Sequence, residues 1–105
     1  MVEVIRQGDV AIIRTDRQLP SGCGAVKLEN GRVILAHGEV TGHAHALEPD
    51  GVALLESPEG RRFLKVDKEA AVTHEEHATV TIPEGIWEVR RQREYSPQEI
   101  RVVAD

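Results

Sequence analysis

The stretch Val-Ala-Leu-Leu-Glu-Ser-Pro-Glu-Gly-Arg-Arg-Phe-Leu-Lys-Val, residues 52–66, indicates an all-β fold. Its two ends, residues 52–56 and 62–66, are rich in Val, Leu and Phe and are predicted strands, and Ser57-Pro58-Glu59-Gly60 between them is a turn sequence. The same pattern continues outward along the chain. We expect further strands at residues 2–6, 10–14, 26–28, 32–36, 78–82 and 86–94, with turns at Asn30-Gly31 and Pro83-Glu84-Gly85. This spacing predicts one all-β domain over residues 1–105, a small barrel or sandwich.

Two segments carry the signature of a helix start. Ser96-Pro97-Gln98-Glu99 combines a capping Ser, Pro at the first helical position and Glu at the third, and Thr73-His74-Glu75-Glu76 has the same cap. We therefore expect at most one or two short helical turns. In a helical turn His74 and His77 would share a face, whereas in an extended chain they would point to opposite faces.

The composition describes a small domain with an aliphatic core. Hydrophobic residues make up 40% of the chain, but only Phe63, Trp87 and Tyr95 are aromatic. The net charge of -5 opposes general binding to nucleic acid or to anionic membranes. Cys23 is the only cysteine, so no internal disulfide can form. Because no stretch approaches the ~20 apolar residues of a membrane span and no signal peptide is evident, we expect a cytoplasmic protein that does not bind membranes.

All five histidines fall in two short windows. The first is Leu-Ala-His-Gly-Glu-Val-Thr-Gly-His-Ala-His, residues 35–45, and the second is Thr-His-Glu-Glu-His, residues 73–77. Imidazole is the commonest metal ligand in proteins, and side chains two apart on a strand project to the same side, as His43 and His45 would. We expect a divalent ion, Zn, Mn, Fe or Ni, with ligands among His37, His43, His45, His74, His77 and Glu48.

Charged residues near these windows suggest further roles. Glu39 and Glu76 are the candidates for a catalytic general base. Arg91 and Arg93 would share one face of a strand and are the candidates for holding an anionic group of a ligand or cofactor. The alternative for the arginines is that they are solvated charges on an exposed strand.

The first window also resembles a known motif. Gly38, His43-Ala44-His45 and Glu48 resemble the first motif of the cupin family, and Pro83-Glu84-Gly85 followed by Glu88 and Gln92 resembles the second. Glu88 stands where that family has a histidine. The resemblance implies a small β-barrel in which His43, His45, Glu48 and Glu88 point inward at a metal ion.

A second resemblance extends over nearly the whole chain. The strings Gln-Gly-Asp-Val, His-Gly-Glu-Val-Thr-Gly-His-Ala-His, His-Glu-Glu-His and Gln-Arg-Glu-Tyr are similar to those of a family of small proteins from bacterial and phage genomes. That family has no characterised function, so the resemblance implies no activity.

Three functions are consistent with the sequence. The first is a small metal-binding β-barrel protein with a His/Glu site, cupin-like, in which the ion would activate a water or polarise a small-molecule ligand. The second is a non-catalytic binding or accessory module, a homo-oligomer or a subunit of a larger complex. The third is a metal-free hydrolase or phosphodiesterase that uses imidazoles as acid and base, with Arg91 or Arg93 holding the anionic group. The sequence does not decide between an enzyme and a binding protein.

Overall fold

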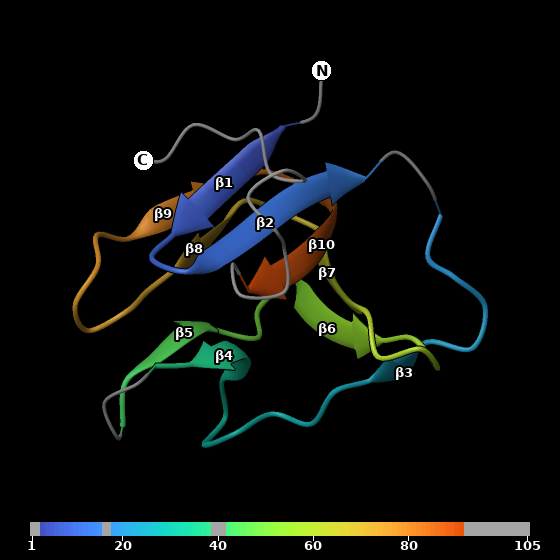
Figure 1. Ribbon diagram of the computed structural model, residues 1–105, viewed down its shortest axis with the longest axis horizontal. Helices are drawn as coiled ribbons and strands as arrows, with labels where there is room; N and C mark the ends of the chain where they lie inside the picture. Colours follow the sequence, from blue (N-terminus) through green and yellow to red (C-terminus); the bar gives the residue numbers. More distant parts are fainter. Residues whose placement is uncertain (1–2, 16–17, 39–41, 92–105) are drawn as a thin grey trace.

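The strands follow one another along the chain without a helix in the part that the structure describes. The computed structural model describes residues 3–15, 18–38 and 42–91 (Figure 1). Its strands are β1 (Val4–Gln7), β2 (Val10–Thr15), β3 (Gly24–Ala25), β4 (Val33–His37), β5 (Ala44–Leu47), β6 (Val52–Glu56), β7 (Arg62–Val66), β8 (Ala70–Val72), β9 (Val80–Ile82) and β10 (Gly85–Arg91). The all-β class predicted from the sequence is confirmed. In these ranges no helix is long and apolar enough to cross a membrane.

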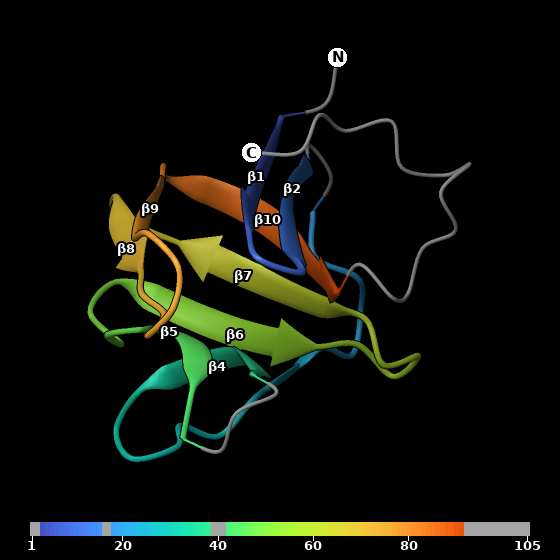
Figure 2. The same cartoon turned by 60° about the vertical axis from the view of Figure 1, so that its left-hand side comes forward.

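Six of the strands form one antiparallel sheet, and the other four form two hairpins. The sheet order is β1-β2-β10-β7-β6-β3, and the hairpins are β4–β5 and β8–β9. Figure 2 shows β10, β7 and β6 side by side, with the β4–β5 hairpin beneath them and the β8–β9 hairpin at one end. The sheet is open, because β1 and β3 are its two edges. The described strands therefore do not form the closed barrel that the cupin resemblance implies.

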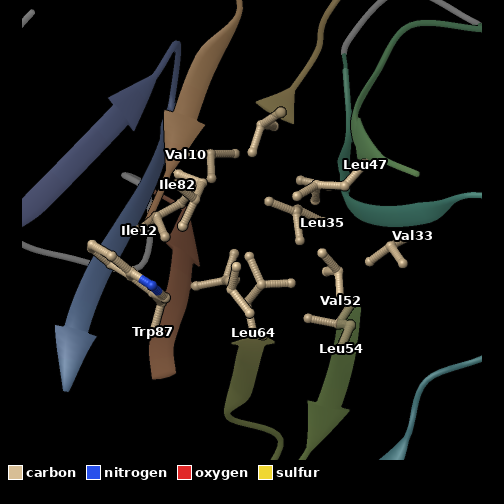
Figure 3. Packing of buried hydrophobic residues seen from close by; sticks show 14 residues of the cluster. Val10, Ile12, Val33, Leu35, Leu47, Val52, Leu54, Leu64, Ile82 and Trp87 are labelled. Carbon is tan, nitrogen blue, oxygen red and sulfur yellow. The ribbon is translucent and has the colours of Figure 1, made fainter. Parts of the chain in front are cut away.

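The hydrophobic core lies between the sheet and the β4–β5 hairpin (Figure 3). Leu54, Leu64 and Trp87 are in register on neighbouring strands, so their side chains share one face of the sheet. Leu35 and Leu47 approach that face from the hairpin. Trp87 is fully buried, and its indole Nε1 donates a hydrogen bond to the carbonyl of Pro83 at 3.0 Å. A buried indole thus keeps its polar group satisfied.

The sequence predictions succeed where local pattern and pairing agree. The strands expected at residues 52–56 and 62–66 form with those bounds and pair with each other. The Asn30-Gly31 turn also forms, with positive φ at both residues and a single bridge between Glu29 and Arg32. The strand predicted at residues 26–28 is wrong: the backbone N–H of Val26 donates to the carbonyl of Leu54, so the chain before the turn follows β6 rather than β4.

The helical turn predicted at residues 73–76 is also wrong. Thr73 exchanges two backbone hydrogen bonds with Ala46, at 2.9 and 3.0 Å, which holds it extended beside β5. The carbonyl of Thr73, which would accept the first hydrogen bond of a helix, is bonded to the N–H of Ala46, and residues 75–77 form a bend. Tertiary pairing has overridden the capping signal. The second predicted turn, at residues 96–99, lies outside the described residues.

Candidate functional site

Four histidines from the two sequence windows meet above β5. The ring centroids of His45 and His74 are 4.3 Å apart, those of His74 and His77 4.7 Å, and those of His43 and His74 6.0 Å. His45 and His77 are also 6.0 Å apart, with nearly parallel rings. Figure 1 shows why: the β1–β2 turn and the β8–β9 hairpin lie on the same side of the molecule as β5. We call these four side chains the histidine cluster.

His45 is the buried centre of the cluster, and its protonation pattern is fixed by Gln7. The His45 side chain is on β5 and the residue is only 1% exposed. Gln7 Nε2 donates to the carbonyls of Val72 and Ala78, at 2.9 and 3.0 Å. Its Oε1 must therefore be the group that faces His45 Nδ1 at 2.8 Å, and an oxygen can only accept. Hence Nδ1 of His45 carries the hydrogen, and Nε2 of the neutral ring carries a lone pair.

The ring of His45 is neutral at physiological pH. Burial, followed by the charges of His74 and His77, lowers the pKa of His45 from 6.5 to about 4, although the nearby Asp9 carboxylate acts in the opposite direction. A neutral imidazole with a defined tautomer and a free lone pair is the form in which histidine binds metal ions.

Asp9, at the β1–β2 turn, faces the lone pair of His45. Its Oδ1 is 3.5 Å from His45 Nε2, and its Oδ2 accepts a hydrogen bond from Arg91 Nη2 at 3.0 Å. Partial burial would raise the pKa of Asp9, but the hydrogen bond and charge of Arg91 outweigh it and hold that pKa below 3.8. Two electron-rich atoms, neither carrying a proton at neutral pH, therefore face each other.

Gly8 allows His77 to approach this pair of atoms. The backbone of Gly8 has a φ of +59°, and a Cβ placed there would lie 2.6 Å from Nε2 of His77. Any other residue would add both backbone strain and a steric clash. The glycine between Gln7 and Asp9 thus lets the His77 ring lie against the β1–β2 turn.

The His-Glu-Glu-His segment is tied to β5 by hydrogen bonds. The backbone N–H of Ala44 donates to Glu75 Oε1 at 2.9 Å, which lowers the pKa of Glu75. His43 Nδ1 is 2.5 Å from Glu76 Oε2, and the N–H of Glu76 donates to His74 Nδ1 at 3.0 Å. The lone pair of His74 Nδ1 is therefore already engaged.

Several residues predicted as ligands lie elsewhere. His37 pairs with Glu29 at 3.0 Å on the exposed end of β4. Glu48 is exposed and lines a separate hollow with Asp50 and Lys68. Glu88, which the cupin resemblance placed at the metal, instead accepts hydrogen bonds from arginines. Glu39 and Arg93 lie outside the described residues.

The described part of the chain contains no group of three or more His, Cys, Asp or Glu side chains arranged so that it could hold a metal ion. The hydrogen bonds above give a physical reason. His43 and His74 each use Nδ1 in a contact with Glu76, and Glu75 accepts from the N–H of Ala44, so these groups are already engaged with one another. The contact between His45 Nε2 and the Asp9 carboxylate joins two side chains, fewer than the three that such a group needs.

The two residues that position His45 were not identified from the sequence. From sequence alone, Asp9 beside Gly8 is typical of a turn residue between two strands. The available signal was the pair of polar residues on either side of Gly8, between the strands predicted at residues 2–6 and 10–14. Their proximity to His45, 38 positions away from Gln7, depends on tertiary structure.

The fold and the cluster define a small all-β domain with a buried histidine at the meeting point of three chain segments. Residues 6–92 match the family described as "Domain of unknown function (DUF8820)", so the chain belongs to that family. The matched range includes every residue of the histidine cluster and both residues that position His45. Searches of curated proteins and of solved structures found no match.

Proposed function

We propose that this protein is a small metal-binding β domain whose divalent ion is held between His45 and Asp9. The supporting observation is the 3.5 Å contact between His45 Nε2 and Asp9 Oδ1. Because Gln7 fixes the hydrogen on Nδ1, these two atoms have no proton between them in the neutral ring. A cation between them would turn a repulsive contact into an attractive one.

The distance fits the edge of a coordination shell. Two ligand atoms that each lie about 2.1 Å from a tetrahedral ion are about 3.4 Å apart. His77 is the candidate for a third ligand, because its Nε2 lies against Gly8, the neighbour of Asp9, and its side chain is exposed. In this proposal His45 and Asp9 are already placed, and a rotation of the His77 side chain completes the site.

The proposed ion and the nearby Glu76 could together activate a water molecule. A bound divalent ion supplies Lewis acidity and lowers the pKa of a coordinated water. Glu76 is half exposed, and its contact with His43 orients its carboxylate. That makes Glu76 the candidate for receiving a proton at the cluster, in the role predicted for it from the sequence.

A metal-free acid–base function is the second candidate, and the His43–Glu76 pair favours it. A carboxylate at 2.5 Å from Nδ1 fixes the proton on that nitrogen and leaves Nε2 of His43 as a base. This is the arrangement of a base and its orienting carboxylate in many hydrolases. Such a site would act at His43 rather than at His45.

Metal titration distinguishes the two candidates. Untagged protein is titrated with Zn²⁺, Mn²⁺, Fe²⁺ and Ni²⁺ by calorimetry, alongside His45→Ala and the control His37→Ala. We expect one ion per chain in the wild type and in His37→Ala, and loss of that binding in His45→Ala. Absence of stoichiometric binding of all four ions to folded wild-type protein would contradict the metal proposal and leave the His43–Glu76 pair as the candidate.

A further inference from the structure

We infer that a second site, an arginine-lined pocket, binds the phosphate group of a small molecule. The pocket has a volume of about 510 Å³ and lies where β10 ends and β7 begins, against β4. Figure 2 shows the end of β10 and the start of β7 at the same end of the sheet. Arg61, Arg62, Arg90 and Arg91 line it. A pocket of this size falls in the range of small-molecule sites.

A buried carboxylate positions two of the guanidinium groups. Glu88 is 9% exposed, and it accepts hydrogen bonds from Arg61 Nε and Nη2, both at 3.1 Å, and from Arg90 Nε at 3.0 Å. Burial would raise the pKa of Glu88, but these hydrogen bonds outweigh it and keep the pKa below 4.5. The carboxylate therefore stays ionised and holds Arg61 and Arg90 in fixed positions. Arg61 is also placed over the Phe63 ring, 5.2 Å from its centroid.

The other two arginines come from the opposite face of the sheet. Arg62 pairs in register with Val89, and the side chain of Val89 is in the hydrophobic core. Arg62 is therefore on the same face of the sheet as the core, at the edge of the core. Its contact with Glu56 is 3.5 Å long and both side chains are at least 40% exposed. Exposed pairs of that kind contribute little stability, so a phosphate can replace Glu56 as the partner of Arg62.

Phosphate is the anion that this arrangement suits best. Guanidinium groups present forked N–H donors that match phosphate oxygens, and several of them can surround one tetrahedral dianion. The chain as a whole carries a net charge of -5, so the gathering of four arginines around one pocket is a local feature. The same net charge disfavours a nucleic-acid backbone as the source of the phosphate.

The inference does not depend on the proposed metal site. None of the four arginines is a ligand of the proposed ion, and among the described residues the ion pair between Arg91 and Asp9 connects the two sites. Phosphate binding can therefore be measured on metal-free protein, and its failure would leave the metal proposal untouched.

The test measures inorganic phosphate and pyrophosphate binding to metal-free protein by calorimetry. The variants are Arg62→Gln and Arg61→Gln, and the matched control is Arg32→Gln, which removes the same charge at a residue that does not line this pocket. A hydrogen bond to a charged group contributes about 1.5–3 kcal/mol, so we expect each pocket variant to weaken pyrophosphate binding by roughly tenfold or more. Arg32→Gln should change it less than about twofold.

Three results would overturn the inference. They are no binding of either anion at millimolar concentration, equal weakening by Arg32→Gln and Arg62→Gln, and binding of succinate as tight as that of pyrophosphate. The last would assign the pocket to dicarboxylates. Because Arg62 is partly exposed and outside the core, Arg62→Gln stays folded, and a thermal melt of each variant checks this.

Discussion

The histidine cluster and the arginine pocket present opposite chemistry at neighbouring places in one small fold. In the cluster two acceptor atoms, His45 Nε2 and Asp9 Oδ1, face each other. In the pocket, guanidinium donors surround the buried carboxylate of Glu88. We therefore propose a cation for the first site and an anion for the second. The ion pair between Arg91 and Asp9, at 3.0 Å, connects the two sites.

The comparison shows that burial acts differently on the two kinds of group. Burial and the charges of His74 and His77 drive His45 to its neutral form, because together they outweigh the opposing effect of the Asp9 carboxylate. Glu88 is also buried, but arginine hydrogen bonds keep it charged. The charge state of each buried group is thus set by the charged and hydrogen-bonding groups around it, and not by the extent of its burial alone.

The largest expected effect is a loss of stability in mild acid. The folded pKa of His45, about 4, is below its unfolded value of 6.5, so the unfolded chain binds more protons between those values. Stability is therefore fully present above pH 6.5 and falls as the pH drops toward 4, by up to about 3 kcal/mol. Urea unfolding of the metal-free protein across this window measures it.

The variant His45→Asn serves as the control for that pH dependence. Asp9 and Glu88 have pKa values below 3.8 and 4.5, so their contributions are lost only at lower pH. We expect most of the slope between pH 6.5 and about 4.5 to disappear in His45→Asn and to persist in His37→Ala. An unchanged slope in His45→Asn would show that the burial of His45 is not its cause.

Gln7→Leu is expected to have the next largest effect, and only on the cluster. The change removes the acceptor that fixes His45 Nδ1–H and the donor to the Val72 and Ala78 carbonyls. Loss of an outer partner of a metal-binding histidine typically weakens metal affinity by about 10–100-fold. Zinc affinity by competition with a chelator measures this, and pyrophosphate affinity should stay unchanged. Equal loss of both affinities would indicate general unfolding.

A matched pair of charge removals should act in opposite directions at the two sites. Asp9→Asn removes the carboxylate from the proposed ion and should weaken metal affinity by about tenfold. Glu88→Gln removes negative charge from beneath the arginines and should strengthen pyrophosphate binding several-fold. Calorimetry of both variants with both ions gives the four values. The contrast between the sites fails if either variant changes both affinities in the same direction.

The smallest expected effect comes from replacing a glycine, and it separates the steric need for glycine at Gly8 from the need for a positive φ. Gly8→Ala and Gly31→Ala both place a Cβ at positive φ, but only the Cβ at Gly8 meets another side chain, that of His77. Each should cost about 1–2 kcal/mol of stability. We expect a several-fold loss of metal affinity only for Gly8→Ala, measured by the same zinc competition. A similar loss in Gly31→Ala would remove His77 from the proposed site.

The sequence pattern correctly predicted the strands and the turn that depend mainly on neighbouring residues. Short runs rich in Val, Leu and Phe on either side of a turn sequence predicted β6 and β7, and Asn30-Gly31 predicted a turn, because each signal depends on neighbouring residues. The predictions of a strand at residues 26–28 and of a helical turn at 73–76 were wrong. In both segments the backbone forms hydrogen bonds with a residue distant in sequence, Leu54 in the first and Ala46 in the second.

The candidate site was predicted in part for the same reason. The choice of His43, His45, His74 and His77 followed from residue type, and the structure brings these four together. Their meeting does not need the helical turn that the sequence suggested, since a bend achieves it. The roles of Gln7 and Asp9, and the pairing of Glu88 with Arg61, arise from contacts between strands and could not be derived from spacing.

The central claim is that His45 presents an unprotonated Nε2 to a cation. Nitrogen NMR of isotope-labelled imidazole rings, recorded at neutral pH before and after addition of Zn²⁺, reads the state of each ring nitrogen directly. We predict that His45 has its hydrogen on Nδ1 in the metal-free protein and that zinc shifts the Nε2 resonance of His45 while leaving His37 unchanged. A His45 ring protonated on Nε2, or one whose Nε2 resonance does not respond to zinc, would contradict the account.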